Sequence, residues 1–255
     1  NHTNVLEIIT NTNTSGQHAF RHAVCDTTVN TCQSSSHWSG SSNSYTFQGS
    51  DMDVIVNLDG SITNLFLEED TPDKIKMKTK QAGKTASQSD YAPAASPSFT
   101  YNTSSASGDD IRSIRMIQSA DGNYHMVYVP TDLSTNGLLY GYCTTECLRG
   151  PALNDWTFSS IAGATSSTFS FAVDSDLIPH LFYSTSSGIQ HTKLVDDSWT
   201  TSLQILNLAA NEIRAEISEN GNLWVGAQLT ANGNLWIIQQ NAFAGNGMGI
   251  DADGD

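Results

Sequence analysis

The sequence predicts an all-β fold, a β-propeller of about five four-stranded blades, and three observations predict it. Short runs rich in β-branched and aromatic residues alternate with turns of Gly, Asn, Asp and Ser along the chain. One pattern, a strand, a tight turn and a second apolar strand, recurs at intervals of about 50 residues. The two ends of the chain each carry part of that pattern.

Each repeat begins with a hairpin. Asp or Asn next to Gly between apolar runs is a strong hairpin signal, because these residues tolerate positive φ. The predicted turns centre on Asp59-Gly60, Asp121-Gly122, Asp176 and Asn220-Gly221. The predicted hairpins are the stretches VNLDGSITNLFLEE, QSADGNYHMVYVP, VDSDLIPHLFYST and ISENGNLWVGAQL.

A third and a fourth strand complete each predicted blade. Third strands are predicted at 17–25, 73–80, 136–143, 187–194 and 232–240. A tryptophan opens the fourth strand at Trp38, Trp156 and Trp199. We therefore expect one domain, 1–255, with blades at 1–50 plus 247–255, 51–110, 111–165, 166–210 and 211–246.

The chain ends are expected to close the propeller. The final GIDADGD matches the first strand and turn of a repeat, and the initial NHTNVLEI matches the second strand. Pairing them would remove an open sheet edge, the Velcro closure. Alternatively, Asp251, Asp253 and Asp255 have the spacing of the start of a calcium loop, although no later bidentate carboxylate follows. Calcium remains the possible metal on the basis of this spacing, and no other cofactor is expected.

The cysteines fall in two close pairs, Cys25 with Cys32 and Cys143 with Cys147. Neither pair has the spacing or the companion histidines of a zinc site, so local disulfides are the preferred interpretation. Disulfides indicate an oxidising compartment, and we expect a secreted or cell-surface protein. No apolar run reaches the roughly 18 residues of a membrane helix, so membrane insertion is not expected.

The charge of the chain excludes some partners. The formal net charge is −15, with 11 Lys and Arg against 26 Asp and Glu. Such a surface argues against binding nucleic acid or anionic membranes. The expected partners are a glycan or a cell-surface protein, with self-association as a further option.

The stretches SADGNYHMVYVP…GLLYGYC…W and DSDLIPHLFYSTSSGIQHTKLVDDSW resemble the repeats of secreted bacterial propellers related to sialidase-type and lectin propellers. Those repeats have the form D-x-x-G-x-x-H-h-x-Y…G-h-x-Y/H…W, where h is apolar. The chain lacks the strict Asp box of sialidases, Ser-x-Asp-x-Gly-x-Thr-Trp. The resemblance implies the fold and an extracellular location. It does not choose among lectins, polysaccharide lyases and glycosidases, all of which occur in the family.

Candidate ligand residues lie in the innermost strands, six positions before each turn residue. This position holds Asp53, Arg115, Ser170 and Arg214, and Gly247 in the C-terminal repeat. Arginines near the axis could bind a carboxylate or sulfate bidentately, with Asp53 beside them. Alternatively, the arginines form ion pairs with Asp53, Glu212 or Glu216.

His22, Tyr140 and His191 align in the third strands and are the weak catalytic candidates. In a polysaccharide lyase, as the resemblance implies, a His/Tyr pair would transfer the proton while an arginine neutralises the uronate. Their symmetric placement equally fits a packing role. The second-strand set is interpreted as packing and turn hydrogen bonding; it comprises His125, His180 and Trp224.

The leading functional hypothesis is an extracellular, lectin-like binding module that recognises glycans or a cell-surface partner. The first alternative is a carbohydrate-active enzyme, a polysaccharide lyase or glycosidase acting on an acidic polysaccharide. The second is a structural subunit of a surface filament or adhesin.

Overall fold

A computed structural model describes most of the chain. The described residues are 5–14, 17–28, 31–47, 52–68, 74–80, 98–100, 113–130, 137–144, 147, 156–161, 163–218 and 222–240. They form two compact units: 1–118 with 143–157, and 119–142 with 158–255. Each unit is described by itself.

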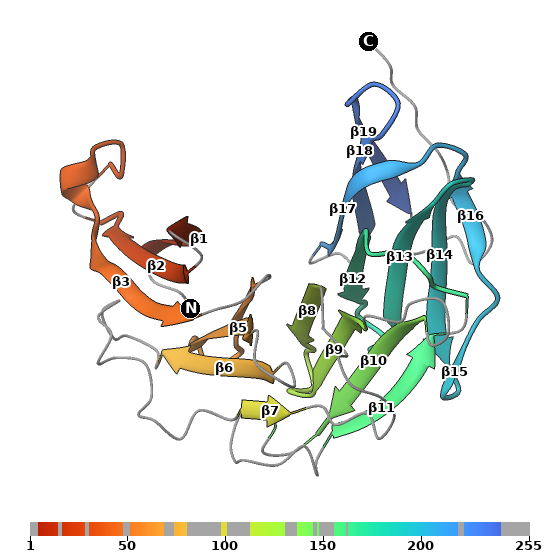
Figure 1. The fold of residues 1–255 in the computed structure, drawn as a ribbon, viewed down its shortest axis with the longest axis horizontal. Coiled ribbons are helices and arrows are strands. Elements are labelled where there is room, and N and C mark those ends of the chain that lie inside the picture. Colours follow the sequence, from red (N-terminus) through yellow and green to blue (C-terminus); the bar gives the residue numbers. More distant parts are fainter. Residues whose placement is uncertain are drawn as a thin grey trace. The chain divides into compact units, whose positions relative to one another are not determined.

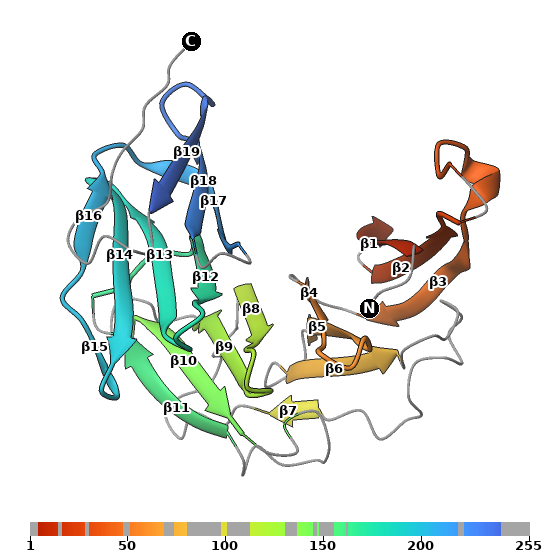
Figure 2. The same cartoon turned by 180° about the vertical axis from the view of Figure 1, so that it is seen from behind.

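The described residues form β-strands grouped in five sheets, with one short 3-10 helix, η1 (Ser35–His37), so the all-β prediction is confirmed. Figures 1 and 2 show these strands from opposite sides. No helix of the described part is long and apolar enough to cross a membrane.

The first unit holds two complete sheets. Consecutive strands are neighbours in both, as expected for meanders joined by short turns. The N-terminal sheet contains β1 (Val5–Thr14), β2 (Gln17–Asp26) and β3 (Ser39–Phe47). The next contains β4 (Met52–Val56), β5 (Ile62–Glu68), β6 (Lys74–Lys80) and β7 (Ser98–Thr100).

The remaining sheets follow the same order. One contains β8 (Ser113–Gln118), β9 (Tyr124–Val129), β10 (Leu138–Cys143) and β11 (Trp156–Ile161). The next contains β12 (Phe169–Val173), β13 (Pro179–Thr185), β14 (Gly188–Val195), β15 (Ser198–Trp199) and β16 (Leu203–Leu206). The last contains β17 (Ala210–Ile217), β18 (Leu223–Leu229) and β19 (Leu235–Gln240).

The five sheets follow the predicted repeats closely, with three differences. Sheet β12–β16 has five strands rather than four, because β14 pairs with both β15 and β16. The last repeat begins at Ala210, one residue earlier than expected, because β17 pairs Ala210 with Leu229. Three strands, rather than four, are described in sheets β1–β3 and β17–β19. The predicted Velcro strand and the turn at Asn220-Gly221 lie outside the described residues, so the closure and the single domain stay predictions.

The hairpin turns of the repeats are closed by equivalent backbone hydrogen bonds. The N–H of the residue that directly follows each first strand donates to the carbonyl four residues later, at 2.8 to 3.0 Å in four repeats. The donor and acceptor pairs are Asn57 and Ser61, Ser119 and Asn123, Asp174 and Ile178, and Ser218 and Asn222. The predicted repeat is therefore visible in the backbone itself.

One turn position requires positive φ. Gly60 and Gly122 occupy it at φ 80° and 89°, and Leu177 occupies it at φ 65° in the next repeat. A leucine in this region is strained because its Cβ crowds the backbone. The Asp176 turn has leucine where its counterparts have glycine, and this difference costs the protein some stability.

Both predicted disulfides are present, Cys25–Cys32 and Cys143–Cys147. A tryptophan side chain contacts each closed loop: Trp38 Nε1 donates to the carbonyl of Cys32 at 3.1 Å, and Trp156 Nε1 to that of Cys147 at 3.4 Å. The disulfide and the following tryptophan thus form one repeated unit.

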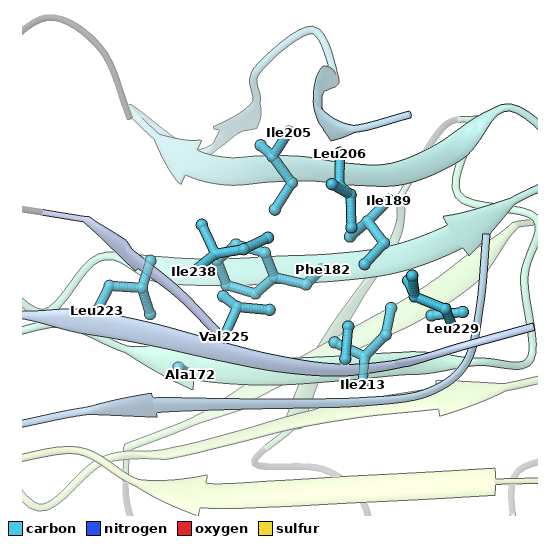
Figure 3. Close-up of a cluster of buried hydrophobic side chains, with 12 residues drawn as sticks. Ala172, Phe182, Ile189, Ile205, Leu206, Ile213, Leu223, Val225, Leu229 and Ile238 are labelled. Carbon is cyan, nitrogen blue, oxygen red and sulfur yellow. The ribbon is translucent and has the colours of Figure 1, made fainter. Parts of the chain in front are cut away.

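The core of the second unit lies between sheets β12–β16 and β17–β19 (Figure 3). Alternate residues of β17 and β18 point into it, because successive side chains of a strand face opposite sides. The buried cluster contains Ala172, Phe182, Ile189, Ile205, Leu206, Ala210, Ile213, Leu223, Val225, Ala227, Leu229 and Ile238. The other face of β17–β19 carries the alternate residues, and these form the site described next.

Candidate functional site

The sheets share one row of residues that crosses three neighbouring strands at the same height, which we call the middle row. It starts at the inner-strand position that the sequence singled out. The register gives Asp53–Leu65–Met77, Ser170–Phe182–His191 and Arg214–Gly226–Ile237. The same position can therefore be compared between sheets.

In two sheets the first residue of the row binds the neighbouring sheet. Asp53 Oδ2 accepts a hydrogen bond from the backbone N–H of Met116 at 2.8 Å. Ser170 Oγ accepts one from the N–H of Ala215, also at 2.8 Å. Met116 and Ala215 each follow an arginine of the set, so these contacts are equivalent. Asp53 thus has a structural contact, and its role in ligand binding stays a prediction.

Arg115 and Arg214 belong to different units, yet each folds back onto its own strand. Arg115 Nη1 donates to the carbonyl of Ile114, and Arg214 Nη1 donates to that of Ile213 at 3.3 Å. Arg214 Nη2 also pairs with Glu212 Oε1 at 2.9 Å. This is the ion pair offered as the alternative interpretation. With the Arg214 side chain 63% exposed, the pair contributes only about 0–1 kcal/mol.

Within the second unit, the middle row of sheet β17–β19 is exposed, whereas its counterparts in the other sheets are buried. Leu65 and Phe182 are fully buried in their sheets, but the equivalent residue here is Gly226, and Ile237 beside it is 57% exposed. Trp224, two residues along β18 on the same face, is 38% exposed. We call this surface the Gly226 face; it comprises Glu212, Arg214, Glu216, Trp224, Gly226, Gln228, Leu235, Ile237 and Gln239.

Trp224 has polar neighbours in register on both sides. Glu216 on β17 and Gln239 on β19 lie directly opposite it, and Arg214 is its diagonal neighbour. Exposed indole with planar carboxylate, amide and guanidinium groups can contact a ligand that has both an apolar face and hydroxyl groups.

The second-strand histidines are buried in hydrogen-bonded chains. His125 Nε2 lies 3.0 Å from Ser119 Oγ, and its Nδ1 lies 2.8 Å from Tyr140 Oη. Because the Ser119 hydroxyl donates to Asp121, it must accept from His125 Nε2–H. The Tyr140 hydroxyl then donates to Nδ1. Every polar atom in this chain is used.

The next sheet contains an equivalent chain. His180 Nε2 lies 3.0 Å from Asp174 Oδ2, and His180 Nδ1 lies 3.0 Å from His191 Nε2. Since the Asp174 carboxylate only accepts, His180 donates through Nε2 and accepts from His191 Nε2–H. Tyr140 and His191, aligned in the sequence, thus play the same donor role.

Burial sets the protonation states of these chains. It lowers the pKa of His125 to about 4, with Asp121 opposing the shift, and that of His191 to about 3, aided by the charges of His180 and Lys193. It also raises the pKa of Tyr140, helped by Tyr142 and Asp197. Burial alone would raise the pKa of Asp174, but hydrogen bonds from His180 and Ile178 outweigh it and lower that pKa. At neutral pH these chains stabilise their hairpins.

The other predicted site residues lie wholly or partly outside the described residues. The backbone of His22 lies in β2, paired with Ile9 and Ser41, and its side chain lies outside the described residues. Asp251, Asp253 and Asp255 also lie outside them. Within the described ranges, no three His, Cys, Asp or Glu side chains are grouped to hold a metal.

From the sequence, Trp224 is interpreted as a packing residue, and Gly226 is not singled out. The signal was present in the repeat alignment, where the buried Leu65, Val127 and Phe182 correspond to Gly226. A glycine where each counterpart is a large apolar residue marks a changed surface.

No protein-family model matches the chain. No curated protein matches its sequence.

Solved structures, in contrast, share its fold. The chain is similar to an exo-β-1,3-galactanase from Clostridium thermocellum, with 9% identity and a TM-score of 0.55 over 96% of this chain and 58% of that one. It is similar to an α-L-arabinofuranosidase from Fusarium graminearum, with 8% identity and a TM-score of 0.59 over 92% and 70%. It is also similar to a GH43 β-1,3-galactosidase, with 11% identity and a TM-score of 0.51 over 92% of this chain and 90% of that one.

These likenesses show the fold alone, because the identities are so low. The chain spans less than two thirds of the galactanases, 58% of the bacterial one and 62% of one from Phanerochaete chrysosporium. With five repeated sheets, the protein is a β-propeller of the kind that GH43 glycosidases also use, and the predicted fold class is confirmed.

Proposed function

We propose that the protein recognises carbohydrate through the Gly226 face. One observation carries the proposal: within the second unit, Arg214 and Ile237 of the middle row of sheet β17–β19 are exposed, and so is Trp224 on the same face. The proteins that share its fold are described as acting on galactans, galactosides and arabinofuranosides. Both observations favour a glycan ligand.

The chemistry of the face suits a sugar. The indole of Trp224 offers a flat apolar surface for the C–H face of a sugar ring. Arg214 donates hydrogen bonds, Glu212 and Glu216 accept them, and Gln228 does both. Sugar hydroxyls are donors and acceptors at once, so this mixture matches them.

The finer description is an extracellular, lectin-like propeller of the sialidase-like repeat type. The two disulfides support an oxidising compartment. Arg115 and Asp53 remain proposed ligand residues within their own unit. A cell-surface glycan is the proposed partner.

A glycan array tests the proposal. We expect Trp224→Ala to weaken binding at least about tenfold and Arg214→Ala to weaken it by a smaller factor. Leu203→Ala is the matched control, because Leu203 is a similarly exposed apolar residue on another sheet. A blank array for the wild type, or equal binding by Trp224→Ala, would contradict the proposal.

The second candidate is a glycosidase, favoured by the enzymes that share the fold. Release of reducing sugar from β-1,3-galactan or from arabinan would establish it. Array binding without release would leave the binding module as the function.

A further inference from the structure

His180 and His191 are joined by a direct hydrogen bond between two imidazole rings in sheet β12–β16. The two nitrogens, Nδ1 of His180 and Nε2 of His191, lie 3.0 Å apart. The rings are stacked with their centroids 5.2 Å apart, and both residues are buried. Phe182 also stacks on the His191 ring, with centroids 4.7 Å apart. The pair therefore links β13 to β14 inside the sheet.

The number of protons on the pair decides whether this bond exists. An N–H···N bond needs one nitrogen with a proton and one without. With no added proton, His191 donates to His180, as described above. One added proton can sit on His191 Nδ1, and the bond remains. With two added protons both facing nitrogens carry hydrogen, so the bond is lost and two charged rings are stacked in a buried place.

The groups around the pair favour one added charge but not two. Asp174 Oδ2 lies 3.0 Å from His180 Nε2 and offsets one positive charge. Lys193 lies directly opposite His180 on β14 and opposes any further charge. The residues opposite His191 on β13 and β16 are uncharged: Phe182 and Leu203. Burial, together with the charges of His180 and Lys193, lowers the pKa of His191 to about 3.

The equivalent chain in sheet β8–β11 does not depend on protons in this way. Tyr140 takes the place of His191, and its hydroxyl lies 2.8 Å from His125 Nδ1. A hydroxyl both donates and accepts, so after rotating it can accept from a protonated Nδ1. Ser119 Oγ accepts from Nε2–H in either state. Burial still lowers the pKa of His125, but no hydrogen bond is lost on protonation.

Loss of the bond between His180 and His191 would loosen the outer part of sheet β12–β16. Both β15 and β16 are joined to this sheet through β14. The strands β14 and β16 also supply Ile189, Ile205 and Leu206 to the buried cluster of Figure 3. Separation of β14 from β13 would therefore open part of that core.

We infer that the His180–His191 pair is an acid-released latch, which holds β14 to β13 while the pair carries at most one added proton and frees β14, β15 and β16 when it carries two. The latch goes beyond carbohydrate recognition and does not depend on it. It opens part of the second unit before the whole unit unfolds.

His191→Tyr tests the latch, because it copies the His125–Tyr140 chain of the preceding sheet. Amide hydrogen exchange, corrected for the intrinsic rates, is followed by NMR from pH 7 to pH 4.5. In the wild type, the opening constant of β14 and β16 should rise up to about tenfold per pH unit below pH 6.5, because the opened His191 takes up a proton. In His191→Tyr this rise should largely disappear.

Tyr140→His is the reciprocal variant, since it places a histidine pair in sheet β8–β11. It should give β10 an acid-dependent opening that the wild type lacks. The amides of β18 are the internal control, because they should not share the opening of β14. Equal pH dependence in the wild type and His191→Tyr, or an identical rise in β14 and β18, would overturn the inference.

Imidazole proton–nitrogen NMR spectra of the wild type decide the matter even if His191→Tyr does not fold. The latch requires one N–H shared between His180 Nδ1 and His191 Nε2 at pH 7. It also requires that this shared N–H is lost over the pH range in which β14 opens. A shared N–H that survives the opening would show that the pair is not the latch.

Discussion

Sheets β12–β16 and β17–β19 have the same hairpin and the same register, yet they use their middle rows differently. In the first, Ser170 and Phe182 are buried, and Phe182 packs into the core of Figure 3. In the second, Arg214, Gly226 and Ile237 leave the row open. The backbone repeat fixes where a row lies, whereas the surface that packs against it decides whether the row is buried.

The largest expected effect is on the free energy of unfolding, and it differs between the two sheets. Phe182→Ala should lower the free energy of unfolding by about 3–5 kcal/mol, because it opens a cavity beside Ile189 and Val225. Trp224→Ala, a truncation of similar size on the Gly226 face, should cost less than about 1 kcal/mol. Urea denaturation of both variants measures the contrast, and similar losses would show that the Gly226 face is packed.

Acid should destabilise the protein through its buried histidines. The pKa values of His125 and His191 lie well below the ordinary 6.5 in the folded protein. The unfolded chain therefore takes up protons first as the pH falls, and stability is lost progressively from about pH 6.5 towards the folded values. We expect a loss of a few kcal/mol between pH 7 and pH 4.5, measured by urea denaturation at each pH.

The control for the acid effect is His191→Phe. This variant removes one of the two titrating groups, so its stability should change less with pH, even if it is less stable at pH 7. A profile as steep as that of the wild type would assign the acid sensitivity elsewhere.

Removing the hydrogen bond between sheets should have an intermediate effect. Ser170→Ala leaves the backbone N–H of Ala215 without its acceptor and should cost about 1–2 kcal/mol. Arg214→Ala, at the same height in the next sheet, removes an exposed ion pair and should change stability by less than about 0.5 kcal/mol. Thermal melts of the pair provide the comparison.

The smallest effect concerns the hairpin of sheet β12–β16. Leu177→Gly should stabilise the protein by about 0.5–1 kcal/mol, because glycine adopts φ 65° without strain. Gly122→Ala, at the equivalent turn, should destabilise by a similar amount and serves as the mirror control. A loss of stability in Leu177→Gly would show that the leucine packs usefully despite its backbone.

Much of the fold could be predicted from the sequence because its signals are local. Asp and Asn turns, apolar runs and the tryptophan after each cysteine pair act over a few residues. The disulfide pairing followed from short separations for the same reason.

The site was predicted less well because its properties depend on neighbours across strands. Repeat counting found Arg214, but its pairing with Glu212 and its exposure follow from what packs against β17. His125 and His180 had equal positions in the alignment, yet only the folded chains show that both ring nitrogens of each are used.

The sequence by itself thus determined an all-β, disulfide-bonded, acidic protein built from repeats, because local propensity and periodicity encode these properties. Only the tertiary structure decided which faces of the repeats are buried. Burial is a property of the partner surface, and a strand such as LWVGAQL does not specify whether a sheet or solvent lies over Trp224 and Gly226.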